Sequence, residues 1–161
     1  MKRFAIFLAF LFLVFLSGCD LEPQFSPHYF SSVVTVKDEN NNKFTAKLIS
    51  SEGENITISM IAPDNVNGIQ FIYKNGELTQ SMGDLSCITD KEYLPAFSFA
   101  SNLYYIITNI KEPATYKGSR ENMNYFVIPC DKGKINIVCS LGEIKHITTD
   151  FSNYIYDFET D

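Results

Sequence analysis

The sequence predicts a mainly β domain of the α+β class: an antiparallel sheet of about eight or nine strands with one covering helix. Three observations indicate this class. Short segments alternate apolar and polar residues with a period of two, and turn-forming residues separate them at short intervals. A single segment instead shows the spacing of three and four that is typical of an amphipathic helix. A one-sided sheet needs a second layer over its apolar face, and this helix would supply it.

The first strands form a hairpin and a third strand. Residues 29–37 are mostly β-branched and aromatic, the run 38–42 consists of turn formers, and residues 44–48 alternate, which predicts the hairpin. A further alternating strand at 56–60 ends before Pro63, because proline cannot donate a hydrogen bond to a neighbouring strand.

The strongest local signal is the pair Asn75-Gly76, which favours a type I′ turn because both central residues of that turn need a positive φ. With a two-residue loop, Tyr73 would face Leu78 across the hairpin. The apolar residues then share one side, which predicts a hairpin with one buried and one solvated face. The apolar side would carry Ile69, Phe71, Tyr73, Leu78 and Met82.

The helical period occupies residues 95–110, and the helix would begin at Pro95, because proline is favoured in the first turn. Its apolar positions are Ala96, Phe99, Ala100, Leu103, Ile106, Ile107 and Ile110. A polar loop is expected over residues 111–124. Strands then resume at 125–130, 135–141, 144–148 and 154–158.

The beginning of the chain has the layout of a secretory leader. Thirteen uninterrupted apolar residues run from Phe4 to Leu16; as a helix they would extend about 20 Å, which is shorter than the hydrocarbon core of a bilayer. The following Leu16-Ser17-Gly18-Cys19 resembles the lipobox of bacterial lipoproteins. That resemblance implies cleavage before Cys19 and a thioether-linked diacylglycerol on its sulfur. An ordinary signal peptide, with Cys19 incidental, is the alternative.

These features divide the chain into a signal peptide over residues 1–18, a lipid anchor and tether over 19–28, and one folded domain over 29–161. Two prolines and little periodicity indicate that the tether is extended. Two or three acyl chains together anchor a protein firmly. We therefore expect a protein held at the extracytoplasmic face of the cell membrane through lipidated Cys19.

The chain is acidic, with 13 Lys and Arg against 19 Asp and Glu. Loss of Lys2 and Arg3 with the leader would leave 11 basic residues against 19 acidic ones, a formal charge of −8. An acidic domain gains nothing from a phosphate backbone, so we do not expect nucleic acid as a partner. The lipid anchor, rather than a basic surface, would hold the protein at the membrane.

Three cysteines, Cys87, Cys130 and Cys139, remain once the first is lipidated, and an exported protein can form a disulfide. If segments 125–130 and 134–139 pair about a turn, Cys130 lies near the turn and Cys139 near the far end. These two are then poorly placed for a bridge. A disulfide from Cys87 to either Cys130 or Cys139 is one expectation, and three unbridged buried thiols are the other.

No catalytic or metal-binding motif is recognisable in the sequence. The two histidines, His28 and His146, lack a second His or Cys at metal-ligand spacing. Phosphate-binding loops, nucleophile elbows and the zinc-protease helix motif are also missing from the sequence. We therefore expect no cofactor, no bound metal and no enzymatic activity.

Five parts of the sequence carry fold markers: Phe44 to Leu48, Ile58 to Pro63, Asn67 to Tyr73 with Asn75-Gly76, Leu94-Pro95 with the helix, and Ile144 to Phe158. Together they resemble small lipoproteins of the outer-membrane lipoprotein-sorting (LolA-like) superfamily, particularly uncharacterised ones from Clostridia-like bacteria. The resemblance spans most of residues 30–158 and consists of fold markers rather than catalytic signatures. It implies a half-barrel, in which a strongly curved antiparallel sheet holds the helix against its concave apolar face.

In characterised relatives the concavity holds acyl chains, so the resemblance implies a binding module for a hydrophobic ligand such as an acyl chain or lipid. The concave face would be lined by Ile58, Phe71, Tyr73 and Ile137. Because Cys19 would tether the protein, a membrane-bound role is expected rather than that of a soluble shuttle. The alternative is that the helix fills the concavity and these residues are ordinary core. The domain would then be a tethered structural, protein-interaction or sensor module without a ligand.

Overall fold

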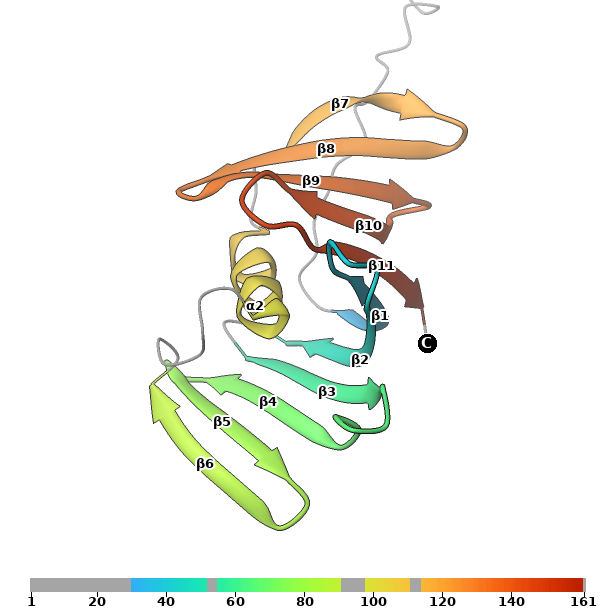
Figure 1. Ribbon diagram of the computed structural model, residues 1–161. Helices are drawn as coiled ribbons and strands as arrows, with labels where there is room; N and C mark the ends of the chain where they lie inside the picture. Colours follow the sequence, from blue (N-terminus) through green and yellow to red (C-terminus); the bar gives the residue numbers. More distant parts are fainter. Residues whose placement is uncertain (1–29, 52–54, 91–97, 111–113, 161) are drawn as a thin grey trace, which may run out of the picture.

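The computed structural model describes residues 30–51, 55–90, 98–110 and 114–160. Within these ranges eleven strands form one open antiparallel sheet that curls around one helix (Figure 1). The strand order is β6-β5-β4-β3-β2-β1-β11-β10-β9-β8-β7. Every adjacent pair in this order is consecutive along the chain except β1 and β11, which join the two halves of the sheet. The prediction of a mainly β fold with one covering helix is confirmed.

The two halves are built from successive hairpins. The first half comprises β1 (Phe30–Lys37), β2 (Lys43–Ser50), β3 (Ile56–Ala62), β4 (Ile69–Lys74), β5 (Glu77–Met82) and β6 (Leu85–Asp90). The second comprises β7 (Thr115–Arg120), β8 (Met123–Cys130), β9 (Gly133–Ser140), β10 (Glu143–Thr149) and β11 (Ile155–Thr160). At the β4–β5 turn both Asn75 and Gly76 have positive φ, and Tyr73 pairs with Leu78 as predicted.

The sheet has two strands that the sequence pattern did not predict, and both lie at its edges. β6 follows the predicted hairpin, and β7 lies inside the segment 111–124 that was expected to be a polar loop. An edge strand pairs on one side only and buries little, so its apolar residues need not alternate clearly. The turn between β7 and β8 is made by Glu121 and Asn122, both with positive φ.

The helix α2 (Phe99–Asn109) begins later than predicted. Ser98 has an extended backbone, and its Oγ accepts a hydrogen bond from the backbone N–H of Ser101 at 3.1 Å. This N-cap satisfies a donor of the first turn and sets the start of the helix, whereas Pro95 lies outside the described residues. The buried side of α2 carries Ala100, Asn102, Leu103, Ile106 and Ile107.

One hydrophobic core lies between α2 and the concave face of the sheet. Its strand residues occupy alternate positions, as a sheet with one buried face requires. Aromatic stacking ties the helix to the sheet: the rings of Phe44 and Phe99 have centroids 5.4 Å apart, and those of Tyr73 and Tyr104 lie 4.0 Å apart. The helix thus acts as the second layer that the one-sided sheet needs.

The predicted signal peptide, tether and Cys19 lie outside the described residues. Among the residues that are described, none belongs to a helix long and apolar enough to cross a membrane.

Candidate functional site

The four predicted lining residues lie on the concave face but differ in burial. Ile58 and Ile137 are 0% and 1% exposed and belong to the packed core with α2. Tyr73 is also buried, whereas Phe71 is only partly buried at the margin of the same cluster. The middle of the concavity is therefore filled at these positions, and a ligand surface must be sought where the helix cover ends.

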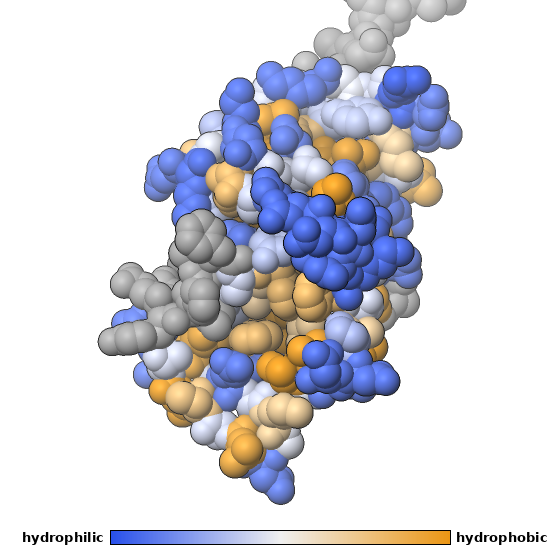
Figure 2. All heavy atoms as spheres, viewed as in Figure 1, coloured by the Kyte–Doolittle hydropathy of each residue, from blue (hydrophilic) through white to orange (hydrophobic). Residues whose placement is uncertain are grey.

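The concave face continues past α2 at the β4–β6 end of the sheet. Strand pairing aligns Ile69 with Met82 and Met82 with Leu85, so these three side chains share the face that carries Tyr73. Met82 is 52% exposed and Leu85 is 78% exposed. Figure 2 shows hydrophobic side chains gathered at the surface over this end of the molecule. Met82 was predicted to be buried, but here the apolar face lies open.

An open groove of about 350 Å³ lies against this surface. Its lining consists of Ile69, Gln80, Ser81, Met82, Leu85, Ser86 and Cys87. This lining contains no carboxylate and no basic side chain, so it can bury an apolar chain without desolvating a charge. The predicted hairpin face pointed to Met82, whereas Leu85 and Cys87 were missed because their strand was not predicted.

The three cysteines are free thiols, and the pairings considered for Cys87 are not made. The sheet topology explains this result. Cys87 is exposed on edge strand β6, whereas Cys130 and Cys139 lie on β8 and β9 in the other half of the sheet. Burial raises the pKa of the Cys139 thiol to about 11. Cys130 lies beside the β8–β9 turn and Cys139 towards the far end, as expected.

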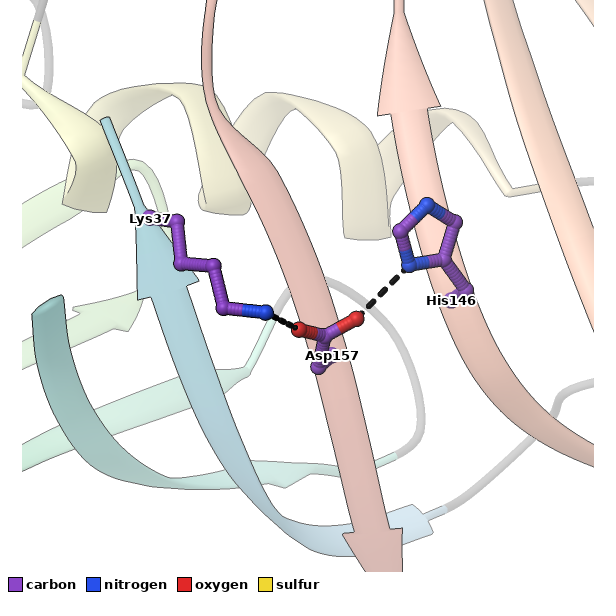
Figure 3. Close-up of polar contacts among 3 residues, drawn as sticks. All are labelled: Lys37, His146 and Asp157. Carbon is purple, nitrogen blue, oxygen red and sulfur yellow. Dashed lines mark hydrogen bonds and ion pairs between the residues drawn. The ribbon is translucent and has the colours of Figure 1, made fainter. Parts of the chain in front are cut away.

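A polar cluster lies on the convex face of the sheet, where β1, β11 and β10 run side by side (Figure 3). The Asp157 carboxylate accepts a hydrogen bond from Lys37 Nζ at one oxygen and lies 2.7 Å from His146 Nδ1 at the other. Burial alone raises the pKa of Asp157, but the hydrogen bonds and charges of Lys37 and His146 outweigh it. The pKa therefore lies below its ordinary value.

This cluster fits a structural role better than a chemical one. Its three side chains are about one-third exposed, and they connect three neighbouring strands across the junction of the two sheet halves. In the described part of the chain, no group of three or more His, Cys, Asp or Glu side chains could hold a metal ion. Sequence reasoning weighed His146 only as a metal ligand and missed Asp157, because only the pairing of β10 with β11 brings them together.

No protein-family model matches the sequence, and no curated protein matches it either. Solved structures with a similar fold include two proteins of low sequence identity. An uncharacterized conserved protein from Thermus thermophilus has a TM-score of 0.49 at 7% identity, over 82% of this chain and 79% of that one. A LolA superfamily protein from Nitrosomonas europaea has a TM-score of 0.44 at 11% identity, over 86% of this chain and 87% of that one. Because both TM-scores lie below 0.5, the fold assignment rests on the strand order and the helix themselves.

Proposed function

We propose that this protein is a membrane-anchored lipoprotein without enzymatic activity, which binds the acyl chain of a lipid at the β4–β6 end of its LolA-like half-barrel. The exposure of Met82 and Leu85 on the concave face carries the proposal. Elsewhere the concave face is buried in the hydrophobic core, whereas the side chains of Met82 and Leu85 are exposed to water. An acyl chain laid on this surface would remove it from water, at about 25 cal/mol per Å² of apolar area.

The composition of the groove supports an uncharged, flexible ligand. Its size of about 350 Å³ lies within the range of small-molecule sites, roughly 300–1,000 Å³. Met82 offers an unbranched side chain that adapts to irregular shapes, and Leu85 offers a branched one. The polar residues of the lining are neutral serine and glutamine side chains beside the Cys87 thiol. The sequence resemblance to LolA-like proteins implies the same class of ligand.

The proposed anchor places this groove beside a source of lipid. Lipidated Cys19 would hold the domain at the extracytoplasmic face of the membrane, with residues 20–28 as the tether. A Cys19→Ser variant of the full chain should leave the membrane fraction and enter the aqueous phase of a detergent phase separation. If the variant stays with the detergent phase once its leader has been removed, the anchor proposal is wrong.

A second candidate function follows from the packing of Ile58 and Ile137, which is dense beneath α2. In that alternative the domain is a tethered interaction module, and a protein partner covers Met82 and Leu85. Both candidate functions predict that a binding partner covers the exposed surface at Met82 and Leu85. They differ in whether a lipid chain alone can occupy it.

Photocrosslinking separates these candidates. The full chain is reconstituted in phospholipid nanodiscs with a fatty acid that carries a diazirine on its chain, irradiated and digested with trypsin. The chain has no Lys or Arg between Lys74 and Lys91, so β5 and β6 appear in one peptide. We expect the label in that peptide, and we expect Leu85→Asp to reduce it at least several-fold.

Leu141→Asp is the matched control, because Leu141 is also an exposed leucine but lies in the β9–β10 turn. This variant should be labelled like the parent. Equal labelling of Leu85→Asp and the parent would overturn the acyl-binding proposal, as would a label confined to other peptides. In that case the exposed surface belongs to a protein interface.

A further inference from the structure

A second pocket, separate from the groove, lies where the β1–β2 turn and the β10–β11 connection meet α2. Its volume is about 360 Å³. Its lining consists of Asp38, Glu39, Asn40, Asn102, Phe151, Ser152, Asn153 and Tyr154. It shares no lining residue with the groove at β4–β6. A ligand at this pocket would therefore be independent of the proposed acyl chain.

Asn102 is the feature that points to a ligand. It lies on the buried side of α2 beside Leu103, it is only 5% exposed, and it lines this pocket. Among the described residues its side-chain carboxamide has no hydrogen-bond partner, although its backbone N–H bonds to Ser98. Because the residue is otherwise buried and lines the pocket, its carboxamide is available to a polar ligand there.

The charge of the pocket is negative. Asp38 and Glu39 line it, and its lining contains no Lys, Arg or His. Glu39 Oε2 accepts a hydrogen bond from Asn153 Nδ2 at 2.8 Å, which holds this carboxylate beside the β10–β11 connection. Burial raises the pKa of Tyr154, and the negative charges of Asp38 and Glu39 raise it further. The field of these two carboxylates therefore extends to the Tyr154 side of the pocket. An anionic ligand is excluded by this field.

The Asp38 carboxylate is arranged to act as a fixed charge. Its Oδ1 accepts hydrogen bonds from the backbone N–H groups of Asn40 and Asn42, both at 2.8 Å. Its Oδ2 accepts one from Asn42 Nδ2 at 2.6 Å. Because both carboxylate oxygens already accept hydrogen bonds within the turn, a metal ion would have to displace the N–H donors of Asn40 and Asn42. The charge favours a cation that needs few direct oxygen ligands.

Aromatic rings complete the pocket. Phe151 and Tyr154 line it, and Phe151 meets Tyr105 of α2 edge to face, with ring centroids 5.5 Å apart. The faces of aromatic rings attract organic cations and also pack against their alkyl groups. Carboxylates, a buried carboxamide and aromatic rings together suit a ligand that joins a positive nitrogen to a short apolar chain.

We propose that this pocket binds a small primary alkylammonium compound. Its ammonium group donates a hydrogen bond to the carboxamide oxygen of Asn102 and is balanced by the charges of Asp38 and Glu39. Its alkyl chain packs against Phe151 and Tyr154. A neutral alcohol of the same length would match the apolar contacts but would leave the two carboxylates without a counter-charge.

The test is an NMR titration of the ¹⁵N-labelled full chain in nanodiscs with n-butylammonium, with n-butanol as the neutral isostere. We expect saturable shifts in the amide signals of the pocket residues with n-butylammonium, and at least tenfold weaker binding of n-butanol. Asn102→Leu should weaken n-butylammonium binding at least tenfold. Added salt should weaken it as well, because the attraction is electrostatic.

Glu39→Gln should weaken binding several-fold. Its matched control is Glu77→Gln, which makes the same change at an exposed position of β5 outside the pocket and should bind like the parent. The unshifted amide signals report whether each variant is folded. Equal binding of n-butanol and n-butylammonium would overturn the proposal. So would parent-like binding by both Asn102→Leu and Glu39→Gln.

Discussion

The ring of Tyr73 in β4 stacks on the ring of Tyr104 in α2, with centroids 4.0 Å apart and planes 14° apart. This contact ties the helix to the strand whose Ile69 lines the open groove. The Tyr73 hydroxyl is buried without a hydrogen-bond partner among the described residues. Burial, and then the neighbouring Tyr104, raise its pKa, so the hydroxyl remains protonated.

Replacing Tyr73 with phenylalanine should therefore leave the free energy of unfolding unchanged or raise it by up to about 1 kcal/mol. The stacked ring is kept, and an unpaired buried hydroxyl is removed. Urea denaturation measures the difference, with Tyr125→Phe as a control at an exposed tyrosine. A loss of more than about 1 kcal/mol in Tyr73→Phe would show that the hydroxyl makes a stabilising bond.

Gly133→Ala should destabilise the fold more than Gly118→Ala. Both glycines have φ values in the region that L-residues rarely adopt, 141° and 133°. Only at Gly133 would an added Cβ meet another side chain, at 2.0 Å from Asp150 Oδ1. That oxygen accepts a hydrogen bond from the Lys134 N–H at 2.6 Å, so the substitution disturbs this bond as well.

We expect a loss of about 1–3 kcal/mol from backbone strain at each glycine, and about 1 kcal/mol more at Gly133. Urea denaturation of the two variants measures both quantities. Equal losses would show that Asp150 moves away without cost.

The convex cluster should make stability depend on pH at acidic values. The pKa of Asp157 in the folded protein lies below its ordinary value of 3.8. The carboxylate therefore stabilises the fold above that ordinary value, and the contribution is lost as pH falls through the lowered pKa. Because Asp157 is 35% exposed, the contribution should be below about 1 kcal/mol and should weaken with salt.

Unfolding of Asp157→Asn and its parent, measured at several pH values, checks this prediction. The variant should be less stable at about pH 6, and the difference should shrink towards about pH 2. Glu159→Gln serves as a control on the same strand, at an exposed position. A difference that grows as pH falls would contradict the assigned direction.

The three thiols should react in an order set by their exposure. Cys87 is exposed and should be alkylated first by iodoacetamide. Cys139 should react last, because it is 2% exposed and burial raises its pKa to about 11, which leaves little thiolate at neutral pH. Peptide mass spectrometry of the full chain over a time course measures the order. Early labelling of Cys139 in folded protein would contradict it.

Alkylation of Cys87 should also report on the groove that it lines. A fatty acid bound there would shield the thiol, so the alkylation rate should fall as the fatty acid is added. Cys130 lies in the other half of the sheet and should react at an unchanged rate. If Cys87 and Cys130 respond alike, the fatty acid acts on the reagent or the membrane rather than in the groove.

The hairpin signals in the sequence were accurate because turn chemistry is local. Asn75-Gly76 predicted the turn between β4 and β5 together with its register, and both were confirmed. The edge strands β6 and β7 escaped prediction, since each depends on a neighbouring strand rather than on an apolar face of its own. Three of the seven residues that line the open groove lie on β6, so the candidate site could be predicted only in part.

Alternation, turn residues and helical spacing determined by themselves that this chain forms a mainly β domain with one helix, because these patterns act over a few residues. Tertiary structure alone decided which distant residues meet. The pairing of β1 with β11 brings Lys37 to Asp157, and the docking of α2 brings Asn102 to Phe151 and Tyr154. The position of α2 on the sheet also decided that Met82 and Leu85 stay exposed. The physical reason is that burial is settled by the cooperative packing of segments far apart in the chain, which no local pattern records.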